Sequence, residues 1–185
     1  ESLLTAYNSH GENISLIRDI ACLYYQTGEV TLWREWYRKL ERKLQEHQAV
    51  LSFNVIMQTW VILGKFYEAE GFETKALSLF VKTYERLKVE NRSDLYYLCL
   101  PQLLRLQSHH GASDSLGQHY SELISLRKDH LNANIAFEIH HSLMLAEMVL
   151  VGPDHAWARV VASLQNTQLL MADRRLIFYD FIEEA

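Results

Sequence analysis

The sequence predicts an all-α protein built from stacked helical hairpins. Four of its seven glycines recur at intervals of 43, 40 and 41 residues: Gly28, Gly71, Gly111 and Gly152. Each lies between an apolar helical run and a polar segment that can start the next helix. Glycine just after a helix end accepts the left-handed conformation that terminates helices. One such turn in every forty or so residues is typical of helical repeats, and no run shows the period-two alternation of a β-strand.

Composition favours long helices around a continuous core. Of 185 residues only seven are glycine and two proline, and 49% are hydrophobic, so residues that break helices are scarce. Apolar residues also recur with helical spacing, as in the stripe formed by Ile17, Ile20, Ala21 and Tyr24. The expected helices are 14–27, 29–47, 49–70, 72–89, 94–110, 113–129, 132–151, 154–169 and 174–184.

Capping signals support these boundaries, with one exception. Pro153 fits a first helical turn, and Ser113 or Asp114 can cap the helix that follows them. Pro101 lies inside an expected helix, which therefore either kinks there or begins later than residue 94. We expect one helical-repeat domain over residues 1–185, with a partial terminal helix after hairpins at 14–48, 49–90, 93–130 and 131–170. Because the chain starts without Met and ends within a helical pattern, we expect it to be a fragment of a larger protein.

The second hairpin combines small and bulky residues in a specific pattern. Gly64 and Ala76 are small enough to let two helices cross closely, and large side chains can fill the space around the crossing. The pattern resembles a tetratricopeptide repeat (TPR), with matches at Trp60, Leu63, Gly64, Tyr67, Gly71, Ala76 and Phe80. The resemblance implies a TPR-like α-solenoid, a right-handed superhelix of antiparallel helical hairpins. The intervals here exceed the usual TPR length of about 34 residues, as in the divergent arrays of maltose-regulator-type bacterial activators and of some eukaryotic assembly subunits.

Charge and motifs argue against several functions. With 18 basic and 23 acidic residues the net charge is −5, which gives no support for nucleic-acid binding. Glu138 and His141 form a single Glu-x-x-His spacing, whereas a di-iron bundle needs two such motifs and further carboxylates. We expect no metal, no cofactor and no enzymatic activity, and buried reduced thiols at Cys22 and Cys99. The longest uncharged stretch, 47–64, is too polar to span a membrane; without a signal-peptide pattern we expect a cytoplasmic protein.

The segment 33–43 is both basic and aromatic. Such a segment suits a nucleic-acid or membrane surface. The interleaved Glu35 and Glu41 instead favour an ordinary solvated face. The spacing of Trp33, Trp36, Tyr37 and Leu40 predicts a core stripe on the same helix.

The resemblance also implies a binding surface, because the first helices of TPR hairpins line a concave groove that holds a peptide or a partner's helix. The groove positions that we expect to bind a partner are Arg18, Tyr25, Gln58, Lys65, Glu68, Gln102 and Arg105. Arg18, Lys65 and Arg105 would form a basic line that attracts an acidic ligand; ion pairs with Asp19 and Glu68 are an equally supported interpretation. The sequence thus predicts a protein-interaction scaffold. The alternative is the ligand-sensing and oligomerisation domain of a bacterial transcription regulator, with a small-molecule effector in the groove.

Overall fold

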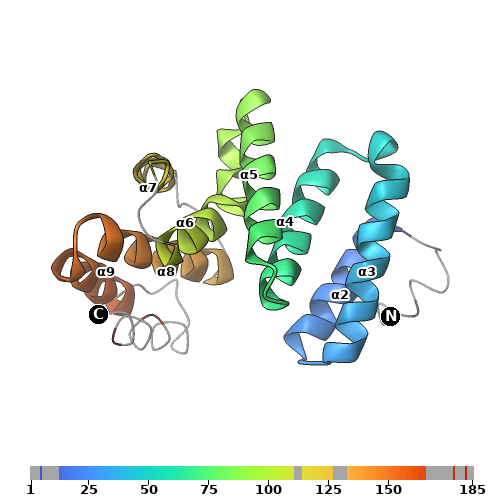
Figure 1. The fold of residues 1–185 in the computed structure, drawn as a ribbon, viewed down its shortest axis with the longest axis horizontal. Coiled ribbons are helices and arrows are strands. Elements are labelled where there is room, and N and C mark those ends of the chain that lie inside the picture. Colours follow the sequence, from blue (N-terminus) through green and yellow to red (C-terminus); the bar gives the residue numbers. More distant parts are fainter. Residues whose placement is uncertain are drawn as a thin grey trace. The chain divides into compact units, whose positions relative to one another are not determined.

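The structure of the chain is a computed structural model that describes Thr5, residues 13–110, 114–126 and 133–165, Ile177 and Ile182. The regular structure of the described residues is entirely helical (Figure 1), which confirms the all-α prediction. The chain divides into two compact units, residues 1–79 and residues 80–185. The boundary falls within one helix, and each unit is described by itself.

The first unit is built around one helical hairpin and the helix that follows it. Its elements are α2 (Ile14–Gln26), α3 (Val30–His47), the 3₁₀ helix η1 (Gln48–Val50), α4 (Phe53–Ala69) and the first part of α5 (Glu73–Val89). α2 packs along α3, and α4 contacts both of them. The helix expected at 49–70 begins only at Phe53, because Gln48–Val50 form the 3₁₀ turn and Leu51 is extended.

The glycine turns have the predicted backbone conformation wherever they are described. The φ angle is +73° at Gly28, +78° at Gly71 and +113° at Gly152. After α4, the amide of Phe72 donates to the carbonyl of Tyr67 at 2.8 Å, which closes the helix end in the manner of a Schellman motif. Asn91, with φ +53°, takes the same conformation after α5, a role that the sequence analysis missed. Gly111 lies outside the described residues.

An aromatic cluster forms the core of the first unit. The ring of Phe66 on α4 lies 5.5 Å from Trp33 and 5.6 Å from Tyr37, both on α3. Trp33, Tyr37 and Leu40 are buried, as the predicted core stripe requires, whereas Trp36 is only half-buried. Large aromatic surfaces in contact make this cluster the main source of hydrophobic stabilisation between α3 and α4.

The residues of the TPR-like pattern are mostly buried. On α4, Trp60, Leu63 and Gly64 are buried and Tyr67 is half-buried. On α5, Ala76 and Phe80 are inaccessible to solvent. This burial fits the packing role that their sizes suggest.

Up to residue 165 and within the described residues, the second unit contains the rest of α5 and four further α-helices. These are α6 (Leu100–His109), α7 (Leu116–Ser125), α8 (Ala133–Leu150) and α9 (Pro153–Gln165), preceded by the 3₁₀ helix η2 (Ser93–Leu98). α6 and α9 both pack on α8, and α7 contacts α6 and α8. One buried cluster consists of Ala136, Met144, Leu145, Ala156, Val160 and Ile177.

Two expected helices of this unit differ from the structure, and two others reach beyond the described residues. Residues 94–110 do not form one helix: η2 comes first, and Pro101 lies in the first turn of α6, where its missing amide costs nothing. The later start is therefore the correct alternative. α7 ends at Ser125, because Leu126 is extended, rather than at residue 129. The expected end of α9 at residue 169, and all of 174–184 except Ile177 and Ile182, lie outside the described residues.

Buried carboxylates connect helices that are far apart in sequence. Tyr67 on α4 donates a hydrogen bond to Glu41 on α3. In the second unit, Glu147 of α8 accepts from the hydroxyl of Tyr120 at 2.5 Å and from the guanidinium of Arg159 at 2.5 Å. Burial and the hydrogen bond to a carboxylate both raise the pKa of Tyr67 and of Tyr120. These pairs hold neighbouring helices in one register.

Candidate interaction surfaces

Two predicted groove residues from different hairpins are in direct contact. Arg18 of α2 donates from Nη1 to Oε1 of Gln58 on α4 at 2.6 Å, although the two residues are 40 positions apart. The first helices of two successive hairpins therefore lie side by side in the first unit. We call the surface formed by Arg18, Cys22 and Tyr25 of α2 with Gln58 and Lys65 of α4 the α2–α4 face.

Arg18 and Lys65 are the two cations of this face, and the carboxylate of Asp19 lies beside them. Arg18 also forms an ion pair with Asp19 at 3.0 Å, one of the pairs that the alternative interpretation expected, and its side chain is 17% exposed. Burial raises the pKa of the Cys22 thiol; the positive charge of Arg18 lowers it, the negative charge of Asp19 raises it, and the positive charge of Lys65 lowers it. Arg18, Asp19 and Lys65 thus all act electrostatically on the same half-buried sulfur.

Tyr25 gives the face an apolar component. Its side chain is exposed, yet its ring makes edge contacts with Trp33 at 5.6 Å and with Phe66 at 5.8 Å between centroids. One edge of the ring is thus anchored in the aromatic core. Glu68, one turn after Lys65 on α4, is half-buried.

The two predicted groove residues of the second unit lie on α6. Gln102 is only 3% exposed and donates from Nε2 to Oε2 of Glu138 on α8 at 2.7 Å. Its side chain is packed between two helices and does not reach a surface groove, contrary to what its expected role requires. Arg105 is half-buried. Because Arg105 and Lys65 belong to different units, the continuous basic line stays a prediction.

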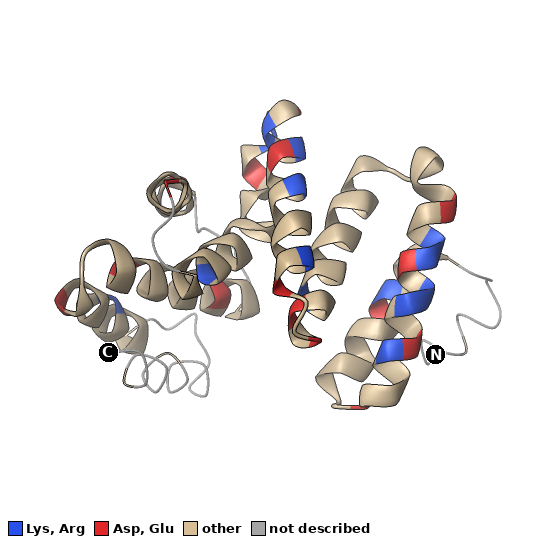
Figure 2. Cartoon of the chain, in the orientation of Figure 1, with Lys and Arg blue, Asp and Glu red and all other residues tan. Residues whose placement is uncertain are grey.

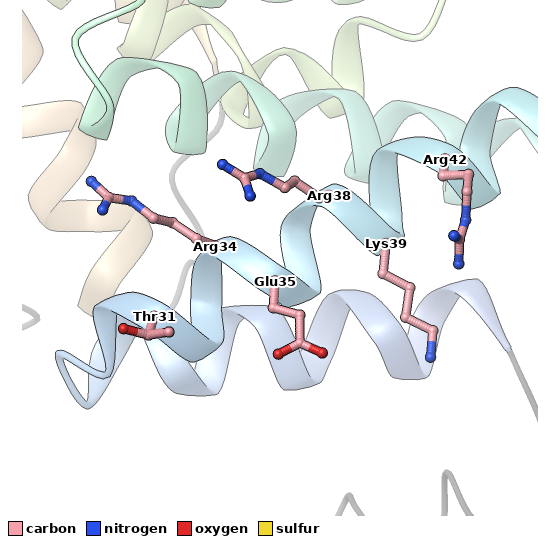
Figure 3. Close-up of a pocket in the computed structure, with 6 residues that line it drawn as sticks. All are labelled: Thr31, Arg34, Glu35, Arg38, Lys39 and Arg42. Carbon is pink, nitrogen blue, oxygen red and sulfur yellow. The ribbon is translucent and has the colours of Figure 1, made fainter.

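A second charged surface lies on α3. A cavity of about 700 Å³ opens beside this helix (Figure 3), and its described lining residues are Thr31, Arg34, Glu35, Arg38, Lys39 and Arg42. We call these six residues the α3 basic face. The interleaved acidic residues predicted an ordinary solvated surface here; the recurrence of arginine at every fourth position was the signal for a more specific role.

The cations of the α3 basic face differ in their partners. Arg34 pairs with Glu70 at 2.8 Å and Arg42 with Glu46 at 3.8 Å, and all four side chains have exposures between 12% and 63%. Arg38 forms no hydrogen bond or ion pair with any residue that the structure describes. In Figure 3, Arg34 and Arg38 extend from one side of α3, and Glu35 and Lys39 extend from the other.

Other kinds of site find no support in the described part of the chain. It contains no group of three or more His, Cys, Asp or Glu side chains that could hold a metal ion. None of its helices combines the length and the apolar character needed to cross a bilayer. Comparison of the sequence and structure with protein-family models, curated proteins and solved structures finds no significant match.

Proposed function

We propose that this chain is a protein-interaction scaffold, a TPR-like right-handed superhelix of helical hairpins that binds a carboxylate-bearing segment of a partner on the α2–α4 face. The observation that carries the proposal is the hydrogen bond between Arg18 and Gln58. It joins the first helices of two successive hairpins, as a groove lined by first helices requires.

The second unit repeats this arrangement. α6 and α8 are the first helices of the third and fourth expected hairpins, and they pack against each other. Gln102 and Glu138, which are 36 residues apart, form the hydrogen bond between them. Adjacent first helices in both units support a surface that is built by repetition rather than by a single pocket.

The chemistry of the α2–α4 face favours an acidic segment with apolar side chains. Arg18 and Lys65 offer positive charge around Cys22, and Tyr25 offers an exposed aromatic ring with an anchored edge. Carboxylates of a partner would form favourable electrostatic interactions with Arg18 and Lys65. An apolar side chain of the partner would pack against the ring of Tyr25. Binding that depends on such charges weakens as salt is raised.

A labelled helical peptide with Glu at every fourth position tests the proposal, with a Gln-substituted peptide as the neutral comparison. Fluorescence anisotropy over a salt series should show tighter binding of the Glu peptide at low salt, and a difference that shrinks at high salt. Lys65→Glu should weaken binding by about fivefold, the effect of replacing an attractive charge by a repulsive one at a partly exposed position.

Lys82→Glu is the matched control, because Lys82 is exposed on α5 and lies outside the α2–α4 face. It should leave the affinity nearly unchanged. Lys65→Gln, which removes the charge without reversing it, provides a milder variant, and thermal unfolding checks that each protein is folded. Equal affinity of wild type and both Lys65 variants for the Glu peptide at low salt would refute the proposed surface.

A further inference from the structure

The α3 basic face is unusually cationic for an acidic chain. Five of the 18 lysines and arginines lie on α3: Arg34, Arg38, Lys39, Arg42 and Lys43. Figure 2 shows how basic residues recur along this helix, with acidic residues between them. The face is made by a second helix of a hairpin, so it does not belong to the α2–α4 face.

The arginines have a spacing that another helix can match. Arg34, Arg38 and Arg42 follow one another at four-residue intervals, which correspond to about 6 Å of rise per step in an α-helix. Carboxylates four residues apart on a second helix repeat over the same distance. Two helices pack with their axes about 8–10 Å apart, close enough for these long side chains to meet carboxylates across the contact.

We propose that the α3 basic face is a second docking surface, which binds an acidic helix of a protein partner along α3. The cavity of about 700 Å³ receives side chains of that helix. The carboxylates of the partner pair with the arginine row, with Arg38 at its centre.

Arg38 is the residue most readily engaged by a partner. Within the described residues it has no ion pair or hydrogen bond, so binding there breaks no contact with any of them. Arg34 and Arg42 have carboxylate partners, but their own side chains are 47% and 63% exposed. Exposed ion pairs contribute little free energy, and both arginines can therefore exchange or share their partners at small cost.

The acidic residues of the face favour a polypeptide over a nucleic acid. Glu35 lines the same cavity, and Glu46 is paired with Arg42. A phosphate backbone carries no cation and would be repelled by both carboxylates. A helix can place a lysine or arginine among its carboxylates and so satisfy Glu35 as well as the arginines.

Trp36 supplies a reporter for this surface. The Nζ atom of Lys39 lies 5.1 Å from the centre of the Trp36 ring, and Trp36 is half-buried at the edge of the face. Its indole N–H resonance should shift when a peptide binds along α3. Trp157, which is exposed on α9 in the other unit, serves as the internal reference. Trp36→Phe identifies the resonance.

The experiment is a two-dimensional NMR titration of the full chain at low salt. The probes are a helical peptide with Glu at every fourth position and one Lys between the Glu residues, its Gln counterpart, and a single-stranded DNA. The Glu peptide should shift Trp36 but not Trp157, and raising the salt should reverse the shift. The charge-reversed variant Arg38→Glu, Arg42→Glu should raise the dissociation constant from this titration by about tenfold, the loss expected from two exposed ion pairs.

Two controls separate this proposal from the proposed function. Lys82→Glu, Arg86→Glu makes the same charge change on α5 and should leave the Trp36 titration unchanged. Lys65→Glu, which tests the α2–α4 face, should leave it unchanged as well. Two results with the Glu peptide would overturn the proposal: a Trp36 resonance that does not shift, or a dissociation constant of the Arg38→Glu, Arg42→Glu variant equal to that of the wild type. Loss of the Trp36 shift in Lys65→Glu would also overturn it. So would a single-stranded DNA that binds more tightly than the Glu peptide.

Discussion

Substituting alanine at Gly71 and at Gly117 should change stability in opposite directions. Gly71 has φ +78°, and a Cβ atom built there meets no other atom within 4 Å. The new methyl group of Gly71→Ala therefore causes no steric clash with other residues. The loss of stability comes only from the backbone, because an L-residue is strained in the left-handed region. That cost is about 1–2 kcal/mol.

Gly117 is the matched control. It lies in the first turn of α7 with ordinary helical geometry, and a Cβ atom there also has open space. Gly117→Ala should stabilise the protein by roughly 0.5 kcal/mol, because alanine reduces the freedom of the unfolded chain.

Thermal and urea unfolding of the full chain, followed by circular dichroism, measure both effects. For a protein of this size, Gly71→Ala should lower the melting temperature by about 2–8 °C, whereas Gly117→Ala should raise it slightly. A shift of both variants in the same direction, or no change at Gly71, would refute the argument that Gly71 is required by its backbone conformation.

Three further predictions concern the cores and the buried polar groups. Trp60→Ala should cost about 3–5 kcal/mol in urea unfolding, because the side chain is 6% exposed; wild-type stability would mean that Trp60 is not in the core. Arg159→Met should lower the free energy of unfolding by about 2–3 kcal/mol, because the buried carboxylate of Glu147 loses one hydrogen-bond donor. Arg86→Met, which breaks the exposed ion pair with Glu90, is the control and should lower it by less than about 0.5 kcal/mol. Similar decreases in the two variants would contradict the prediction. Burial lowers the pKa of His119. As pH falls, His119 is therefore protonated in the unfolded chain before it is protonated in the folded one, and the free energy of unfolding should decrease below the ordinary histidine pKa of about 6.5. His119→Gln should flatten this pH dependence of the free energy of unfolding, and an unchanged slope in the variant would contradict the prediction.

Local signals in the sequence were sufficient for most of the helices and for the glycine turns that the structure describes. Gly28, Gly71 and Gly152 take positive φ because each follows a helix end, and this depends only on neighbouring residues. The buried stripe of Ile17, Ile20 and Ala21 likewise follows from helical periodicity. These features could be predicted without knowing how the helices pack.

The role of Gln102 could not be predicted in the same way. We expected Gln102 to face the groove because it lies 40 residues after a groove-facing position of the second hairpin, and 40 residues is the interval between Gly71 and Gly111. Gln102 lies in α6, after the 3₁₀ helix Ser93–Leu98, and α8 packs against α6. Gln102 therefore faces α8 instead of solvent.

The polar contacts between helices could not be predicted from patterns in the sequence either. Glu41 meets Tyr67, and Glu147 meets both Tyr120 and Arg159, only because packing brings distant helix faces together. A sequence shows the carboxylate but not which side chain lies opposite to it. The same holds for the hydrogen bond between Arg18 and Gln58, because the sequence placed both residues on the expected groove but did not indicate that they are in contact.

The central claim, that a partner segment binds on the α2–α4 face, can be tested through the reactivity of Cys22. The chain has two cysteines. Cys99 is fully buried and burial raises its pKa to about 12, whereas Cys22 of α2 is half-buried, although burial raises its pKa as well. Iodoacetamide should therefore modify Cys22 and spare Cys99 in the folded protein.

The decisive measurement is the rate of Cys22 alkylation with and without the Glu peptide, followed by mass spectrometry while anisotropy reports binding in the same samples. If the peptide lies on the α2–α4 face, the rate should fall in proportion to the bound fraction and recover when salt releases the peptide. An unchanged rate with the peptide bound, or no binding of the Glu peptide at low salt, would contradict the proposed surface.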